Sequence, residues 1–295
     1  MWLDNLPRLL DNGNVQTEVL HALSSSLKAF NGWASGEIAS EARIACGGHG
    51  FSYYSLLGHL HDMSNIHQTW EGDNTVLLMQ TQNFILKSTQ KIMSGKIEAP
   101  ETLEFISHGS DTLEPYQGKF DDIDAIELWL EQRACFLVFN AITMMMADPS
   151  KAKDIFSKYQ AFDFRDMCLA YNELFCLKTF KEFVGKINHK ETKVVYENLL
   201  LMYLLTRLNK HASYTKGSEE DSKLKEAIMD LCQSLRPELV SLTDAFPFPN
   251  KMLGPLGNED LDYVNRFYDH FMSQKDVKDR ASWWKTSYVN ADKAK

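Results

Sequence analysis

Apolar residues recur at helical spacing along most of this chain, and this feature restricts its fold more than any other. In the stretch VLHALSSSLKAFNGWA they step by three and four and so share one helical face: Leu20, Leu23, Leu27, Phe30 and Ala34. Strand-like alternation is nearly absent, and glycine and proline are sparse, at 15 and 8 of 295 residues. The pattern predicts an all-α fold made of two helical bundles.

The first predicted bundle covers residues 1–95. Its first helix is expected to stop at the glycines of CGGHG, residues 46–50, and a second helix is expected to begin after Glu71. Leu78 and Ile85 repeat every seven residues on that second helix. A polar stripe, expected on another face, consists of Gln80, Asn83 and Lys87.

Residues 96–120 lose the helical period and carry Pro100 and Pro115, so they are interpreted as a linker. The second predicted bundle covers residues 121–295. Its first helix has the apolar stripe Leu130, Ala134, Leu137, Ala141 and Met144, and further helices are predicted at 163–187, 191–210, from about 224 to Pro237, and at about 259–274.

Composition limits the classes of partner. The net charge is −9 and no basic stripe stands out, so we expect no nucleic-acid partner. The longest apolar stretches are too short to span a bilayer, so we expect no membrane partner. The five cysteines are scattered without a CxxC pair, which is typical of reduced thiols.

The glycine turn CGGHGFS has two interpretations. Gly47, Gly48 and Gly50 can simply end a helix. They can also let the backbone approach a ligand, whose phosphate or pyrophosphate would meet exposed N–H groups. The pattern is neither a Walker loop nor GxGxxG after a strand.

Glu71, in HQTWEGDNTV, also has two interpretations. A carboxylate ahead of a helix favours the helix dipole, yet Asp73 and Asn74 are better N-cap residues. Glu71 would then be free to act as a catalytic base. Trp70 could exclude water from Glu71 and so raise the pKa of its carboxylate. Gly72 would remove steric bulk beside that carboxylate.

Other chemistry is not indicated. The histidines His59, His61 and His67 lack a completing ligand at an obvious spacing, and HxH on a helix places its two rings on different faces, so no metal site is expected. Met144, Met145 and Met146 are interpreted as core residues.

Three segments in this order, LHALSSSLKAF, ACGGHGFS and TWEGDNTVLLMQTQNFILK, together resemble the acyl-CoA oxidase family of peroxisomal flavin enzymes. A later stretch, LRPELVSLTDAFPFP, resembles the C-terminal domain of that family. The match is densest over residues 20–90, with a second patch at 235–258.

The resemblance implies that Glu71 is the base that removes the α-proton of an acyl-CoA, while the β-hydride passes to FAD and gives a trans-2-enoyl-CoA. O2 then reoxidises the flavin and yields H2O2, in the first step of peroxisomal fatty acid β-oxidation. Gly47, Gly48 and Gly50 match the segment that meets the flavin pyrophosphate, usually that of the partner subunit of a homodimer. Asp73, Asn74 and Thr75 match positions near the dinucleotide part of the cofactor.

The resemblance also implies that two further domains of the family, an N-terminal helical one and a β-rich middle one, lie outside this sequence. Three interpretations remain open: a part of a working oxidase, a short product that acts with a separate chain, or a non-catalytic dimerisation or interaction module derived from an oxidase. An acyl-CoA dehydrogenase is a further alternative, but the second helical bundle favours the oxidase. The final residues, NADKAK, contain no SKL-type peroxisomal signal.

Overall fold

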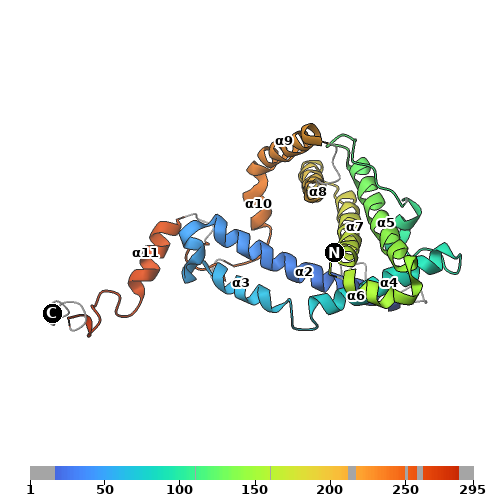
Figure 1. Cartoon of the computed structure of the whole chain (residues 1–295). Helices are drawn as coiled ribbons and strands as arrows, with labels where there is room; N and C mark the ends of the chain where they lie inside the picture. The colour runs from blue at the N-terminus through green and yellow to red at the C-terminus, as the bar shows by residue number, and fades with distance from the viewer. Residues whose placement is uncertain are drawn as a thin grey trace. The chain divides into compact units, whose positions relative to one another are not determined.

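The all-α fold class is confirmed by the computed structural model of the chain (Figure 1). The structure describes residues 17–109, 111–159, 161–211, 217–249, 252–257 and 262–285, and none of these residues lies in a strand. The α-helices are α2 (Thr17–Ala45), α3 (Leu57–Ile66), α4 (Asn74–Met93), α5 (Ile123–Ala147), α6 (Ala152–Tyr159), α7 (Asp163–Gly185), α8 (Lys190–Lys210), α9 (Gly217–Leu235), α10 (Leu239–Asp244) and α11 (Tyr263–Ser273). The 3-10 helices are η1 (Gly47–Phe51), η2 (Tyr53–Ser55), η3 (Glu101–Ser107), η4 (Pro149–Lys151) and η6 (Arg236–Glu238).

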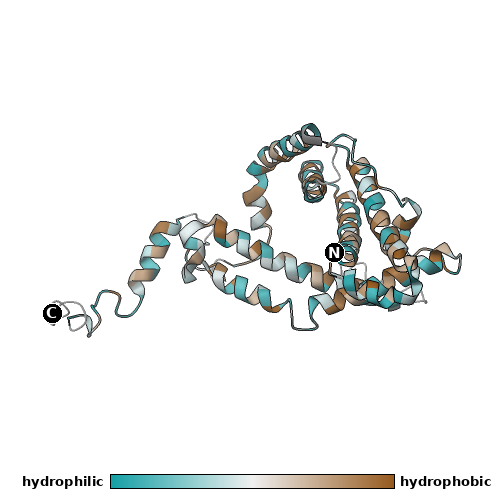
Figure 2. Cartoon of the chain, in the orientation of Figure 1, coloured by the Kyte–Doolittle hydropathy of each residue, from teal (hydrophilic) through white to brown (hydrophobic). Residues whose placement is uncertain are grey.

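The long predicted helices are confirmed. Four residues of the predicted stripe on α5 pack inward as expected: Leu130, Ala134, Leu137 and Ala141 are buried. Met144 and Met145 are only partly buried, and Met146 is 66% exposed, so the interpretation of Met146 as a core residue is wrong. Asp122 caps this helix by accepting a hydrogen bond from the backbone N–H of Ala125 at 2.9 Å. Hydrophobic and hydrophilic residues are interspersed along the helices (Figure 2).

The chain forms two compact units. The first comprises residues 1–33 and 68–244, and the second comprises residues 34–67 and 245–295, so α2 contributes to both. In the first unit α7 packs against α4, α5 and α8, and α8 packs against α9. In the second unit α3 packs against η1 and η2. The two units divide the chain at other positions than the domain boundaries expected from the sequence, which were 1–95, 96–120 and 121–295. Those domain boundaries remain a prediction.

Residues 96–120 are not a free connection. They contain η3, whose Leu103, Phe105 and Ile106 are buried in the core and pack against α5. The indole Nε1 of Trp129 donates a hydrogen bond to the carbonyl oxygen of Glu114 at 2.9 Å. The α-helical period is lost here because a short 3-10 helix turns every three residues, and the segment still belongs to the first unit.

A buried carboxylate ties three helices of the first unit together. Glu173 of α7 is 3% exposed and forms ion pairs with Arg133 of α5 at 3.7 Å and Arg207 of α8 at 3.3 Å. His211 Nε2 donates to it at 3.1 Å. Burial alone would raise the pKa of Glu173, but the His211 hydrogen bond and the two arginine charges outweigh burial and lower that pKa. The carboxylate therefore stays ionised and fixes α5, α7 and α8 at one point.

Candidate functional site

Glu71 lies in the turn between α3 and α4, and its backbone is in a rare conformation. The turn is closed by a hydrogen bond from the Asn74 N–H to the Gln68 carbonyl oxygen at 3.0 Å. Glu71 has φ +58° and Gly72 has φ +107°. Positive φ suits glycine, whereas it is uncommon and unfavourable for glutamate. The turn therefore holds a carboxylate at a position where glycine would be the lower-energy choice for the backbone.

Lys28 of α2 anchors this turn. Its Nζ donates one hydrogen bond to the Gly72 carbonyl oxygen at 2.6 Å and another to Asn74 Oδ1 at 2.8 Å. Asn74 is 2% exposed, and its Nδ2 donates to the Ala29 carbonyl oxygen at 3.3 Å. Three hydrogen bonds thus fix the part of the Glu71 turn that lies next to α2, and we call this group of bonds the Lys28 clamp.

Asp73 caps α4, as the sequence predicts. Its Oδ1 accepts hydrogen bonds from the N–H groups of Thr75 at 2.9 Å and Val76 at 3.4 Å. Glu71 is therefore not needed as a cap. Asn74 lies one residue inside the helix with its amide engaged in the clamp, while Asp73 and Thr75 remain exposed.

The apolar enclosure expected around Glu71 is not formed by the described residues. Trp70 is 48% exposed and Glu71 is exposed as well. The clamp draws Gly72 and Asn74 toward α2, whereas residues 70 and 71 face solvent. An apolar wall for Glu71 would have to come from atoms outside the described residues.

The glycine turn ends α2, as expected. The Cys46 N–H donates to the Ala42 carbonyl oxygen at 3.2 Å, and Gly47 follows with φ +57°, the left-handed conformation common just past a helix end. Gly50 is buried, and a Cβ at this position would lie 1.9 Å from the Arg43 carbonyl oxygen. Gly50 is thus required by contact with the α2 backbone.

Gly47 and Gly48 differ from Gly50 in their surroundings. Both are exposed, and a Cβ added at either would meet nothing within 4 Å. The open space beside two residues without side chains suits the approach of a phosphate group to the backbone. These two positions therefore fit a pyrophosphate-bearing cofactor.

The structure brings the candidate residues together in two groups. Glu71, Asp73, Asn74 and Thr75 share one turn in the first unit, and the three glycines share another in the second unit. Lys28 is the site residue that sequence reasoning missed. The one signal was a lysine at the edge of the apolar stripe, directly after Leu27.

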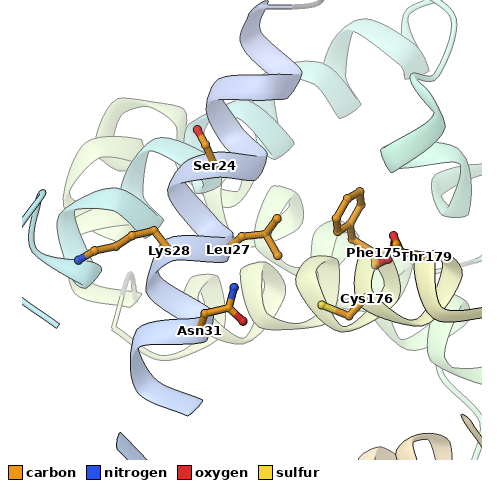
Figure 3. A pocket seen from close by; sticks show the side chains of 7 residues that line it. All are labelled: Ser24, Leu27, Lys28, Asn31, Phe175, Cys176 and Thr179. Atoms are coloured by element: carbon orange, nitrogen blue, oxygen red, sulfur yellow. Dashed lines mark hydrogen bonds between the residues drawn. The ribbon is translucent and has the colours of Figure 1, made fainter. Parts of the chain in front are cut away.

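A cavity of about 500 Å³ lies between α2 and α7 in the first unit. Leu27, Phe175 and Cys176 form part of its lining, and Figure 3 shows Leu27 pointing toward α7. The ammonium of Lys28 lies on the other side of α2 from Phe175 (Figure 3). Lys28 also belongs to the lining of the cavity, while its ammonium donates to Gly72 and Asn74 of the Glu71 turn.

Within the described ranges, no three His, Cys, Asp or Glu side chains are grouped as a metal would require. Of the helices in the same ranges, none has both the length and the apolar character to cross a membrane.

Comparison with known proteins identifies the family. A family model described as "Acyl-CoA oxidase, C-alpha1 domain" matches residues 5–86, and one described as "Acyl-CoA oxidase" matches residues 122–291. The second match alone covers more than half of the 295 residues. The chain belongs to the acyl-CoA oxidase family.

Curated relatives agree with this assignment. The chain is 31% identical over 264 residues to peroxisomal acyl-coenzyme A oxidase 1 of Rattus norvegicus, a match that covers 84% of this chain and 40% of the relative. It is 26% identical over 294 residues to peroxisomal acyl-coenzyme A oxidase 3 of Homo sapiens, covering 92% and 41%. The chain thus spans about two fifths of the length of these relatives.

Solved structures share the fold. Acyl-CoA oxidase 1 of Arabidopsis thaliana superposes with a TM-score of 0.87 at 22% identity, over 99% of this chain and 46% of that one. Acyl-CoA oxidase-2 of Caenorhabditis elegans, solved with FAD, ascaroside-CoA and ATP, superposes with a TM-score of 0.86 at 22% identity, over 99% and 44%. The likeness establishes that this chain has the fold of the helical C-terminal part of these oxidases.

Proposed function

We propose that this chain carries the catalytic base and part of the flavin-binding surface of a peroxisomal acyl-CoA oxidase. The observation that supports the proposal most is the unfavourable backbone conformation of Glu71, whose carboxylate is exposed. The Lys28 clamp holds the backbone that follows Glu71. Unfavourable conformations persist where the surrounding structure enforces them, and they cluster at functional sites. A non-catalytic dimerisation module gives no reason to place glutamate at this φ.

Glu71 would accept the proton from the α-carbon of an acyl-CoA thioester. Such a proton is weakly acidic, so the base must be close and correctly aimed. The clamp meets the second requirement, because it fixes the backbone immediately after Glu71. Removal of a proton by a positioned base is worth roughly a hundred- to ten-thousandfold in rate.

FAD, when bound, would accept the hydride from the β-carbon and pass its electrons to O2. Gly47 and Gly48 would let its pyrophosphate approach their backbone, and the exposed Asp73 and Thr75 would face the dinucleotide. Gly50 would act indirectly, by setting the course of the turn against α2. A homodimer would supply each cofactor with glycines from its partner subunit, as the family resemblance implies.

The test is the visible spectrum of the purified chain with added FAD, followed by acyl-CoA under anaerobic conditions. We expect the chain to take up FAD and show a flavin band, and we expect that band to bleach with acyl-CoA once the two further domains of the family are present. The variant Glu71→Gln should take up FAD normally and bleach at least about a hundredfold more slowly. The matched control Glu98→Gln removes an exposed carboxylate beyond the end of α4 and should bleach at the normal rate.

Two results would contradict the proposal. Normal bleaching by Glu71→Gln would remove Glu71 as the base. A wild-type chain that takes up no FAD would contradict the cofactor assignment for this chain.

A further inference from the structure

The glycine turn is supported by the C-terminal part of its own unit. Phe267 of α11 meets the ring of Tyr54 edge-on at 5.1 Å between centroids, and it meets the ring of His49 at 6.0 Å. His49 lies within the turn itself, in η1, and Tyr54 lies in η2 directly after it. One aromatic side chain of α11 therefore touches both 3-10 helices.

A second contact comes from the next turn of the same helix. His270 lies three residues after Phe267, on the same face of α11, and its ring meets Tyr54 edge-on at 5.2 Å. Edge-to-face pairs at such distances are favourable beyond the area they bury. Phe267 is partly buried, whereas its neighbour Tyr268 is 59% exposed.

The backbone at Gly254 makes a third contact. Gly254 has φ +71°, and a Cβ at this position would lie 2.9 Å from the Tyr54 carbonyl oxygen. This close approach requires glycine on both grounds, space and conformation. The segment before α11 thus reaches the same tyrosine from its backbone side.

From these contacts we infer that residues 252–257 and 262–273 brace the glycine turn, so that the affinity of the chain for FAD depends on this C-terminal segment. The inference rests on the proposed function, because it takes Gly47 and Gly48 to face the cofactor. Binding at a preformed backbone surface avoids the cost of ordering it, so a loosened turn would bind more weakly. Phe267, His270 and Gly254 are positioning residues in this scheme and touch no substrate.

The test compares Phe267→Ala with Tyr268→Ala, two aromatic truncations at adjacent positions of α11. Two quantities are measured in each variant of this chain: hydrogen exchange of the amides of residues 47–55, and the Kd for FAD from the visible spectrum. We expect Phe267→Ala to speed exchange in the turn and raise the Kd about fivefold, the effect typical of one aromatic pair. Tyr268→Ala should change neither quantity.

A second variant tests the contact between Gly254 and Tyr54. Because Gly254 lies outside α11, this variant still tests the brace if Phe267→Ala unfolds α11. Gly254→Val presses on the Tyr54 carbonyl and should also speed exchange at residues 47–55. Unchanged exchange in both Phe267→Ala and Gly254→Val would overturn the brace. Faster exchange with an unchanged Kd would overturn its link to the cofactor. A wild-type chain without FAD affinity would contradict the proposed function, and exchange would still decide whether the brace exists.

Discussion

The two segments that carry the candidate residues are held in different ways. The Glu71 turn is tied by hydrogen bonds that converge on Lys28 and Asn74. The glycine turn is held by close packing, with Gly50 against the α2 backbone and His49 against Phe267. Hydrogen bonds fix the positions of particular donor and acceptor atoms, whereas close packing limits the space that side chains can occupy. The first turn should therefore respond to loss of a donor, and the second to added or removed bulk.

The largest expected effect is on the packed turn. Gly50→Ala places a Cβ 1.9 Å from the Arg43 carbonyl oxygen, a backbone atom of α2 that cannot move aside cheaply. We expect the free energy of unfolding to fall by about 3 kcal/mol, the upper end for overpacking. Urea unfolding of the chain measures this change.

Gly48→Ala is the matched control for that prediction. Its Cβ meets nothing within 4 Å, so folding should be unaffected. If FAD approaches Gly48, the same methyl group should weaken FAD binding while stability stays constant. Equal destabilisation by both alanines would contradict the distinction between a packed and an open glycine.

The sequence predicts those parts of this arrangement that depend on local rules. Glycine at the end of α2 and aspartate ahead of α4 follow from the needs of helix ends, and both are confirmed. The buried face of α5 follows from helical spacing. Each of these involves residues within a turn or two of one another.

Contacts between distant segments were beyond such rules. The Lys28 clamp joins α2 to the turn before α4, and the Phe267–Tyr54 contact joins α11 to η2. No periodicity marks a lysine as a partner for a remote carbonyl oxygen. The burial of Phe105 in an expected linker was likewise missed, since a short 3-10 helix lacks the α-helical period.

An intermediate effect is expected at the polar clamp. Lys28→Met keeps much of the side-chain length but removes the donor, leaving the buried Asn74 Oδ1 without this bond. We expect a loss of about 1–2 kcal/mol in the free energy of unfolding. The rate of flavin bleaching should fall while the KM for acyl-CoA changes little, because the aim of Glu71 is disturbed and not the binding of substrate.

Lys87→Met is the control for the clamp, since Lys87 is an exposed lysine on the polar stripe of α4. Lys87→Met should change neither the free energy of unfolding nor the rate of flavin bleaching. Lys28→Arg should recover part of the bleaching rate, because a guanidinium can still donate to both oxygens. A Lys28→Met variant with a normal bleaching rate would show that the clamp supports only the fold.

The smallest expected effect concerns the backbone of Glu71, and it has the opposite sign. Glu71→Gly relieves the unfavourable φ of +58° but makes the unfolded chain more flexible, so the net gain in the free energy of unfolding should be at most about 1 kcal/mol. Glu71→Ala removes the same carboxylate and keeps the unfavourable φ, so it should show no gain. Flavin bleaching should be lost in both variants.

If the glycine variant were instead less stable than the alanine variant, the backbone conformation would not be costly. If both variants were much less stable than wild type, the carboxylate would serve the fold. The order of the three stabilities therefore separates a carboxylate kept for chemistry from one kept for structure.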